Sequence, residues 1–232
     1  MGGAGKGAAG GLIVAEFFLA LALFLMAHVL PSRRGLRARM VAAVGERRYL
    51  LGYSLLSLAL IAWLISAAVR APVVPLWPTQ PWHYHAALTL MLPAAMLFLS
   101  GALEPNPLSV AFRKSGYDPQ RPGIVGLTRH PILWAFLLWS LAHVLPNGDL
   151  VSLILFGGFA LFALGGTKIL DRRKRREMGP EWQRLAATGR PDFGSLVVAV
   201  VGGAVLWAVL LWLHPLVIGP NPAAVLGWTG AS

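Results

Sequence analysis

The sequence predicts an all-α fold, a polytopic integral membrane bundle of six transmembrane helices. Of the 232 residues, 56% are hydrophobic and only 12% are charged, and the apolar residues form long continuous stretches. Ordinary soluble domains carry about twice this share of charge, and one aqueous core could not bury so much apolar side chain. Nine tryptophans, together with abundant Leu, Val and Ile, exclude a disordered chain.

Each predicted span is an apolar stretch that is long enough, or nearly so, to cross a hydrocarbon core of roughly 30 Å. The six stretches are 11–30, 50–69, 86–103, 131–146, 150–170 and 195–218. The fourth is the shortest, and Pro146 to Asp149 after it has turn composition. We therefore expect a tight helical hairpin, 131–146/150–170. Residues 1–10 and 219–232 are expected to be tails, the first flexible, around a single membrane domain, 11–218.

The basic residues indicate the orientation of these spans. The net charge is +11, and of the 20 Lys and Arg residues only Lys6 and Arg70 lie away from three segments, 31–49, 104–130 and 168–194. Positive residues concentrate on the cytoplasmic side of a membrane, so both termini are expected to face outward. The basic loops lack interleaved aromatic residues, which argues against nucleic-acid binding. We expect the run Arg172–Arg176 to contact anionic lipid headgroups of the bilayer.

The chain has no cysteine. This excludes disulfide scaffolds, iron–sulfur clusters, thiolate-ligated haem and cysteine zinc sites. Histidine is then the natural nitrogen ligand for any iron in this protein.

Ionisable residues inside a bilayer are candidate site residues because they are costly there. The candidates are Glu16, His28, His143 and, at the edge of a span, His130. His28 and His130 lie near the cytoplasmic end, whereas His143 lies about 20 Å from His130 along the helix, at a depth comparable with Glu16. Two structural interpretations stay open: His143 hydrogen-bonds to Glu16, and His130 is simply an interfacial residue at a helix start. His83, His85 and His214 are expected to be interfacial.

Two tryptophans accompany the histidines of the fourth span. His130 and His143 point about 140° apart around one helix. Trp134 shares a face with His130, and Trp139 shares a face with His143. One straight helix therefore cannot easily present both histidines to one metal ion.

From Arg129 the chain reads Arg-His-Pro-Ile-Leu-Trp, and further on Ala142-His143, Asn147-Gly148-Asp149, Phe156-Gly157-Gly158 and Asp171-Arg172-Arg173. With Ala27-His28 and Gly45-Glu46-Arg47, this resembles the NnrU family of membrane proteins over roughly residues 12–190. The stretch 128–173 is specific. Relatives include zeta-carotene isomerase, a haem b enzyme with histidine ligands, and bacterial members are associated with denitrification. The resemblance implies a protein of the bacterial inner membrane, and the distribution of basic residues then places both termini on the periplasmic side.

The resemblance also implies a function and a site. We expect haem b, with His28 and His143 as metal ligands, His130 as an alternate ligand or catalytic group, and Trp134 and Trp139 in the cofactor site. Glu16 is expected to act beside them as a catalytic, orienting group. The substrate would be a hydrophobic polyene, isomerised under redox control, or nitric oxide. Because His28 and His143 lie at different depths, a His28–His130 pair and a single axial ligand stay open, as does the oligomeric state.

A second likeness involves Arg129-His130-Pro131 and the segment Glu177 to Trp182. It resembles isoprenylcysteine carboxyl methyltransferases and membrane sterol reductases, which implies a cytoplasmic cofactor pocket lined by His130, Glu177 and Glu181. A third hypothesis is a non-enzymatic membrane accessory protein.

Overall fold

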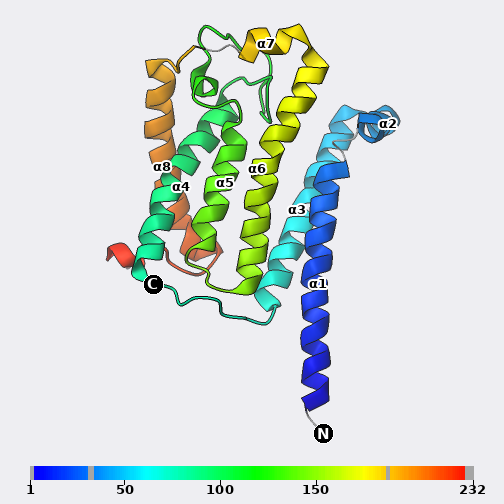
Figure 1. The fold of residues 1–232 in the computed structure, drawn as a ribbon, viewed down its shortest axis with the longest axis vertical. Helices are drawn as coiled ribbons and strands as arrows, with labels where there is room; N and C mark the ends of the chain where they lie inside the picture. The colour runs from blue at the N-terminus through cyan, green and yellow to red at the C-terminus, as the bar shows by residue number, and fades with distance from the viewer. Residues whose placement is uncertain (1–2, 31–33, 187–188, 228–232) are drawn as a thin grey trace. The chain divides into compact units, whose positions relative to one another are not determined.

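The computed structural model describes residues 3–30, 34–186 and 189–227, and these form helices and turns without a strand. The all-α class is therefore confirmed. The chain divides into two compact units, 1–75 and 76–232 (Figure 1). The membrane domain expected over 11–218 includes parts of both units, which we describe one at a time.

Unit 1 is built from α1 (Gly3–Val29), α2 (Arg34–Val44) and α3 (Glu46–Arg70), and α1 packs along α3. Because α1 begins at Gly3, residues 3–10 of the expected N-terminal tail are helical; residues 1–2 lie outside the described ranges. Gly45 separates α2 from α3 with φ +82°, a left-handed value that glycine adopts without a Cβ penalty. The basic stretch expected as a loop is thus largely helical, although residues 31–33 are not described.

Unit 2 contains four long or apolar helices, which neighbour one another in the order α8, α4, α5, α6 (Figure 1). They are α4 (Pro81–Leu103), α5 (Pro131–Val144), α6 (Leu150–Met178) and α8 (Phe193–Val217), with α7 (Pro180–Ala186) after α6. Two short 3₁₀ helices complete the unit, η2 (Gly123–Gly126) and η3 (Ala224–Leu226). The helical hairpin expected from the sequence is confirmed, since α5 and α6 are joined by a short turn and pack together.

Local signals explain where these helices begin. Asp149 and Asp192 accept hydrogen bonds from the backbone N–H of Ser152 and Ser195, which caps α6 and α8. Pro131 starts α5, and His130 before it has a non-helical backbone, as a residue preceding proline favours. On α8, a Cβ at Gly203 would meet the Cα of Met96 on α4, so glycine allows these two helices to approach closely.

The number of spans differs from the expectation. Five helices of the described chain are long and apolar enough to cross a membrane, namely α1, α3, α4, α6 and α8. The predicted fourth span is α5, an apolar helix of 14 residues. At a rise of 1.5 Å per residue it is about 21 Å long, shorter than the roughly 30 Å hydrocarbon core. Pro131 at one end and the turn around Gly148 at the other prevent its extension.

The basic connections of unit 2 lie at one end of its helices. The loop after α4 packs on α7, where Leu108, Val125, Trp182 and Leu185 form a buried cluster, and both lie at the upper end of unit 2 in Figure 1. The opposite end carries the α5–α6 turn, on which Trp77 lies: its backbone N–H and its ring Nε1–H donate to the carbonyls of Gly148 and Leu145. The basic connections and the α5–α6 turn with Trp77 therefore lie at opposite ends of unit 2.

Candidate functional site

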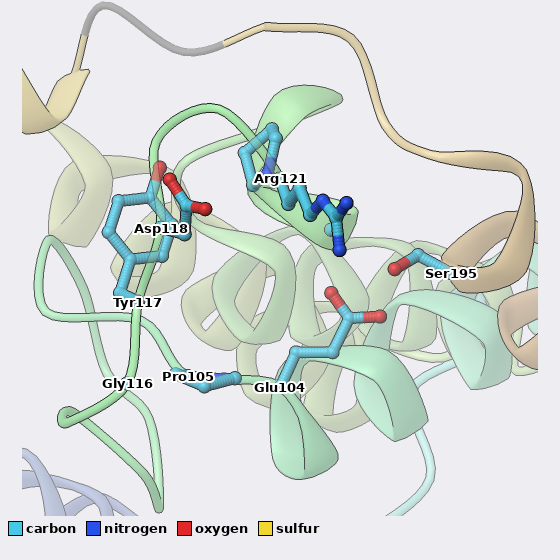
Figure 2. Close-up of a pocket in the computed structure, with 9 residues that line it drawn as sticks. Glu104, Pro105, Gly116, Tyr117, Asp118, Arg121 and Ser195 are labelled. Atoms are coloured by element: carbon cyan, nitrogen blue, oxygen red, sulfur yellow. The ribbon is translucent and has the colours of Figure 1, made fainter.

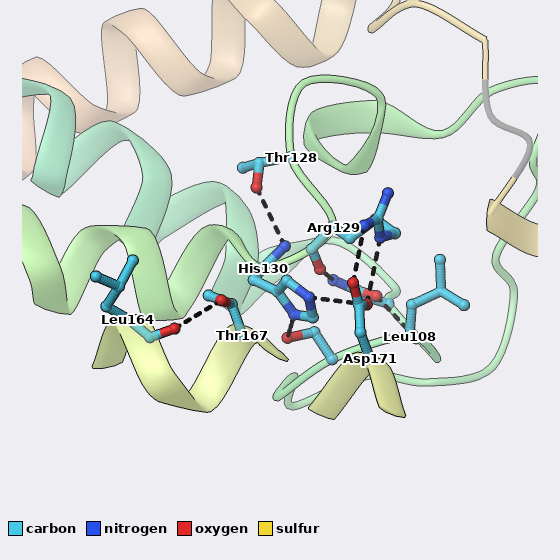
Figure 3. A network of polar contacts seen from close by, with 9 residues as sticks. Leu108, Thr128, Arg129, His130, Leu164, Thr167 and Asp171 are labelled. Carbon is cyan, nitrogen blue, oxygen red and sulfur yellow. Dashed lines mark hydrogen bonds and ion pairs between the residues drawn. The ribbon is translucent and has the colours of Figure 1, made fainter. Parts of the chain in front are cut away.

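His130 lies at the start of α5 and connects three parts of unit 2. Its Nε2–H donates to Oδ1 of Asp171 on α6 at 3.0 Å, and its Nδ1 accepts from the hydroxyl of Ser109 at 2.7 Å. A carboxylate only accepts hydrogen bonds, so Nε2 is the protonated nitrogen of the neutral ring. Figure 3 shows His130 between Thr128, Arg129 and Asp171. The loop after α4, the start of α5 and the end of α6 are thereby tied together.

Arg129 supplies the positive charge of this network. Its Nη2 donates to Oδ2 of Asp171 at 2.9 Å, and its Nε donates to Oδ1 at 3.4 Å. Its guanidinium group also lies 5.6 Å from the ring centre of Trp182 on α7. The side-chain amide of Asn106 donates to the carbonyl of Arg129 at 2.9 Å. The carboxylate of Asp171 thus receives hydrogen bonds from both Arg129 and His130.

The burial of this network limits its chemistry. His130 is 4% exposed and Ser109 is 3% exposed. Burial lowers the pKa of His130, while Asp171 opposes the shift, so the ring is neutral at physiological pH. Ser109, His130 and Asp171 are the residue types of a hydrolase triad, but the hydroxyl of Ser109 is inaccessible to a substrate. Both His130 nitrogens are already hydrogen-bonded, which leaves no lone pair for iron. The network is best interpreted as a structural clamp.

A second polar site surrounds Glu104 at the end of α4. Its Oε2 accepts from the backbone N–H of Ile124 at 2.5 Å, and a Cβ at Gly123 would overlap the same carboxyl group. Burial raises the pKa of Glu104. A cavity of about 120 Å³ lies beside it, with Arg121 and Ser195 in its lining. In Figure 2 the Arg121 guanidinium points toward Glu104 and Ser195. The cavity is small and has charged walls, which suits a small polar ligand or water.

His143 lies at the other end of α5, among aromatic rings. Its Nδ1–H donates to the carbonyl of Trp139 at 2.7 Å. The ring centre of His143 lies 4.8 Å from that of Trp139 and 5.0 Å from that of Phe156 on α6. Trp139 in turn stacks with Phe159 at 6.1 Å. Because Nδ1 carries the proton, the lone pair of His143 is on Nε2.

In unit 1, His28 has the same hydrogen-bonding pattern as His143. Its Nδ1–H donates to the carbonyl of Phe24 at 2.8 Å, and its ring contacts that of Phe24 at 4.2 Å. Glu16 on α1 is held by α3: its Oε1 accepts from Arg70 at 2.7 Å and from Trp63 at 2.9 Å. A hydrogen bond between Glu16 and His143 was one interpretation left open by the sequence, and the structure shows that Arg70 compensates the Glu16 carboxylate.

The other predicted site residues lie in different parts of unit 2. His130 and His143 lie at opposite ends of α5, as expected. Trp139 contacts His143, whereas Trp134 is 39% exposed. Sequence reasoning assigned no role to Asp171 or Ser109, although Asp171 carried a signal: it is an acidic residue at the end of an apolar span, directly before a basic run.

The comparisons agree with the resemblance seen in the sequence. The family model described as NnrU protein matches residues 16–222. A comparison with curated proteins and one with solved structures give no match. The matched region contains α1 from Glu16 onward, α2 to α8 and all the histidines described above. The chain belongs to the NnrU family.

Proposed function

We propose that this protein binds haem b in the membrane through histidine imidazoles and acts on an apolar or gaseous substrate. One observation supports this most directly: His28 and His143 each donate from Nδ1 to a backbone carbonyl, which leaves Nε2 as a lone-pair donor. This is the tautomer that a metal-bound histidine adopts when its other nitrogen is hydrogen-bonded to a carbonyl. His28 in unit 1 and His143 in unit 2 are therefore each a proposed ligand. His130 is not, because Ser109 and Asp171 occupy its nitrogens.

The residues around His143 fit such a ligand. Trp139 and Phe156 give one imidazole an apolar surrounding, which limits the access of water to whatever that imidazole binds. The bond to the Trp139 carbonyl orients the ring and raises the basicity of Nε2. When bound, haem would supply one-electron redox chemistry at this site.

The proposed reaction is the redox-gated isomerisation of a hydrophobic polyene or a redox step on a nitrogen oxide. The spans expose many large apolar side chains, so a substrate can reach the protein through the lipid. We place the protein in a bacterial inner membrane with both termini on the periplasmic side. The gathering of the basic connections at one end of unit 2 supports this orientation, and reporter fusions at Arg172–Arg176 and at the C-terminus test it.

The test of haem binding is an absorption spectrum of the detergent-purified protein after expression with ample haem. We expect a Soret band in the oxidised and reduced protein, and its absence would remove the proposal. If the band is present, the reduced and oxidised forms are each given a cis-polyene and nitric oxide. Conversion of the polyene by the reduced form alone would identify the isomerase, whereas a spectral change and turnover with nitric oxide would identify the nitrogen-oxide reaction.

A second candidate function rests on a different site. A cavity of about 390 Å³ is lined by Arg175, Gly179, Pro180, Trp182 and Gln183, in the segment that resembles methyltransferases and sterol reductases. None of the three residues expected to line it, His130, Glu177 and Glu181, is in this lining; Glu181 pairs with Arg184 at 2.8 Å. Titration with S-adenosylmethionine and with NADPH tests this candidate, and saturable binding that is lost in Trp182→Ala would favour it over the haem protein.

A further inference from the structure

The cavity at the end of α6 has a basic and aromatic lining. Its volume is about 390 Å³, and it is lined by Arg175 of α6, by Trp182 and Gln183 of α7, and by the turn at Gly179 and Pro180. This volume is within the range of small-molecule sites. The only charged residue among these lining residues of the described chain is an arginine, so the cavity favours an anionic occupant.

The arginine of this lining lies against the tryptophan. The guanidinium group of Arg175 is 4.3 Å from the ring centre of Trp182, which is a cation–π contact. Trp182 is itself buried in the cluster with Leu108, Val125 and Leu185, so the packing of α7 fixes the ring. Stacking leaves the N–H groups at the edge of the planar guanidinium available, and these donate readily to phosphate oxygens. Arg175 is therefore preorganised to bind a phosphate group.

The basic residues of the α6 end differ in their charge compensation. Arg173 and Lys174 share the carboxylate of Glu177 at 3.4 and 3.9 Å. Within the described ranges, three further arginines of α6 pair with no carboxylate, namely Arg172, Arg175 and Arg176. At 100° per residue these three side chains lie within about 100° of one another around the helix. The uncompensated positive charge is thus gathered on one face, which includes the arginine of the cavity.

The depth of the cavity matches the headgroup layer of a bilayer. The apolar part of α6, 150–170, is about 31 Å long at 1.5 Å per residue, and the hydrocarbon core is roughly 30 Å thick. Arg175 follows this part by five residues, or about 7.5 Å along the helix axis. The headgroup layer on each side of the core is about 5–7.5 Å thick. Arg175 therefore lies at the level of lipid phosphates.

An exposed apolar strip leads from the cavity along α6. Leu161 and Leu164 are exposed, and at 100° per residue both lie within about 40° of Arg175 around the helix. A phospholipid combines a phosphate in the headgroup layer with acyl chains in the hydrocarbon core. Inorganic phosphate and soluble cofactors have no such chains. The strip therefore favours a lipid over a soluble phosphate compound.

We propose that the cavity at Arg175 and Trp182 binds the phosphate group of one anionic phospholipid. Arg175 donates to the phosphate oxygens, Gln183 supplies a further amide donor, and the acyl chains lie along the α6 strip. This goes beyond a general attraction of the basic run to headgroups, because it assigns one lipid to one site. It also gives the cavity a lipid in place of the soluble cofactor of the second candidate function. It does not depend on haem, since no described histidine lines this cavity.

The experiment measures the binding of dioleoyl-phosphatidylglycerol to the detergent-purified full-length protein by native mass spectrometry. Dioleoyl-phosphatidylcholine, which has no net charge, is the control lipid. We expect the wild type to bind one phosphatidylglycerol at a saturable site and phosphatidylcholine more weakly.

Arg175→Gln and Arg176→Gln form a matched pair, because both remove one positive charge from an exposed residue of α6 and only Arg175 lines the cavity. Loss of general attraction to an anionic lipid is similar for the two. Arg175→Gln also removes hydrogen bonds to a charged group, so it should weaken phosphatidylglycerol binding about tenfold more than Arg176→Gln. Arg175→Lys keeps the charge but not the planar fork, and should restore only part of the affinity. Without lipid, all three variants should melt close to the wild type.

The outcomes separate the lipid site from its alternatives. Equal losses in Arg175→Gln and Arg176→Gln would overturn the site and leave a diffuse basic surface. Displacement of the lipid by inorganic phosphate at comparable concentration would overturn a lipid as the occupant, and so would competition by S-adenosylmethionine or NADPH. A wild type without a Soret band that still binds phosphatidylglycerol through Arg175 would overturn the haem proposal and support the lipid site.

Discussion

Asp171 is the residue on which the clamp at the basic end of unit 2 depends, and Asp171→Asn tests that role. The Asp171 carboxylate accepts hydrogen bonds from Arg129 at 2.9 and 3.4 Å and from His130 at 3.0 Å. Asparagine keeps the shape and one acceptor but removes the charge. Each hydrogen bond to a charged group contributes about 1.5–3 kcal/mol. The Arg129 side chain is 38% exposed, so water replaces part of what is lost, and we expect a net loss of about 2–3 kcal/mol.

Thermal unfolding of the detergent-purified protein, followed by tryptophan fluorescence, measures this loss. A loss of 1 kcal/mol lowers the midpoint by about 2–4 °C in chains of this size, so Asp171→Asn should lower it by roughly 4–12 °C. The matched control is Glu181→Gln, which removes a carboxylate from an exposed pair with Arg184 and should change little. If the proposed haem is bound, its spectrum should be the same in Asp171→Asn, because His130 is not a proposed ligand. Equal midpoints for Asp171→Asn and Glu181→Gln would refute the role of the clamp.

Two further changes test the packing of unit 2. Burial raises the pKa of Glu104 above 4.5, so folding favours its protonated form. Its contribution to stability is fully present below about pH 4.5 and is lost as the pH rises through the folded-state pKa. The melting temperature of the wild type relative to Glu104→Gln should therefore fall as the pH rises above about 4.5, and a constant difference would contradict the shift. Gly203→Ala places a Cβ against Met96 and should destabilise by about 1–3 kcal/mol. Gly158→Ala, with nothing within 4 Å of the added Cβ, should be neutral or slightly stabilising. Equal melting temperatures for these two variants would count against close packing of α4 on α8.

The helical class and the hairpin were predictable because they depend on local properties of the chain. A run of apolar residues forms a helix in lipid wherever it lies, since the backbone must satisfy its own hydrogen bonds there. The turn after α5 was equally visible in Pro146, Asn147 and Gly148. The span count was less accurate, because Pro131 fixes the start of α5 and leaves it at 14 residues.

The sequence predicted which residue type supplies the candidate ligands, but it did not predict which ring nitrogen of each histidine carries the proton. The absence of cysteine and the resemblance to the NnrU family both indicated histidine, and both follow from the sequence directly. The sequence does not show which nitrogen of a histidine is free, because that depends on neighbours that are distant along the chain. Asp171 and Ser109 are hydrogen-bonded to the two ring nitrogens of His130, whereas Nε2 of His143 has no hydrogen-bond partner among the residues that the structure describes.

The amino-acid sequence by itself determined that this is a helical membrane protein of a recognisable family, since hydrophobicity, charge distribution and motif spacing are properties of short segments. Only the tertiary structure decided that Asp171 closes a clamp on His130 and that Arg175 lies against the ring of Trp182. These pairings join residues on separate helices, and their distances are set by how the helices pack, which no single segment encodes.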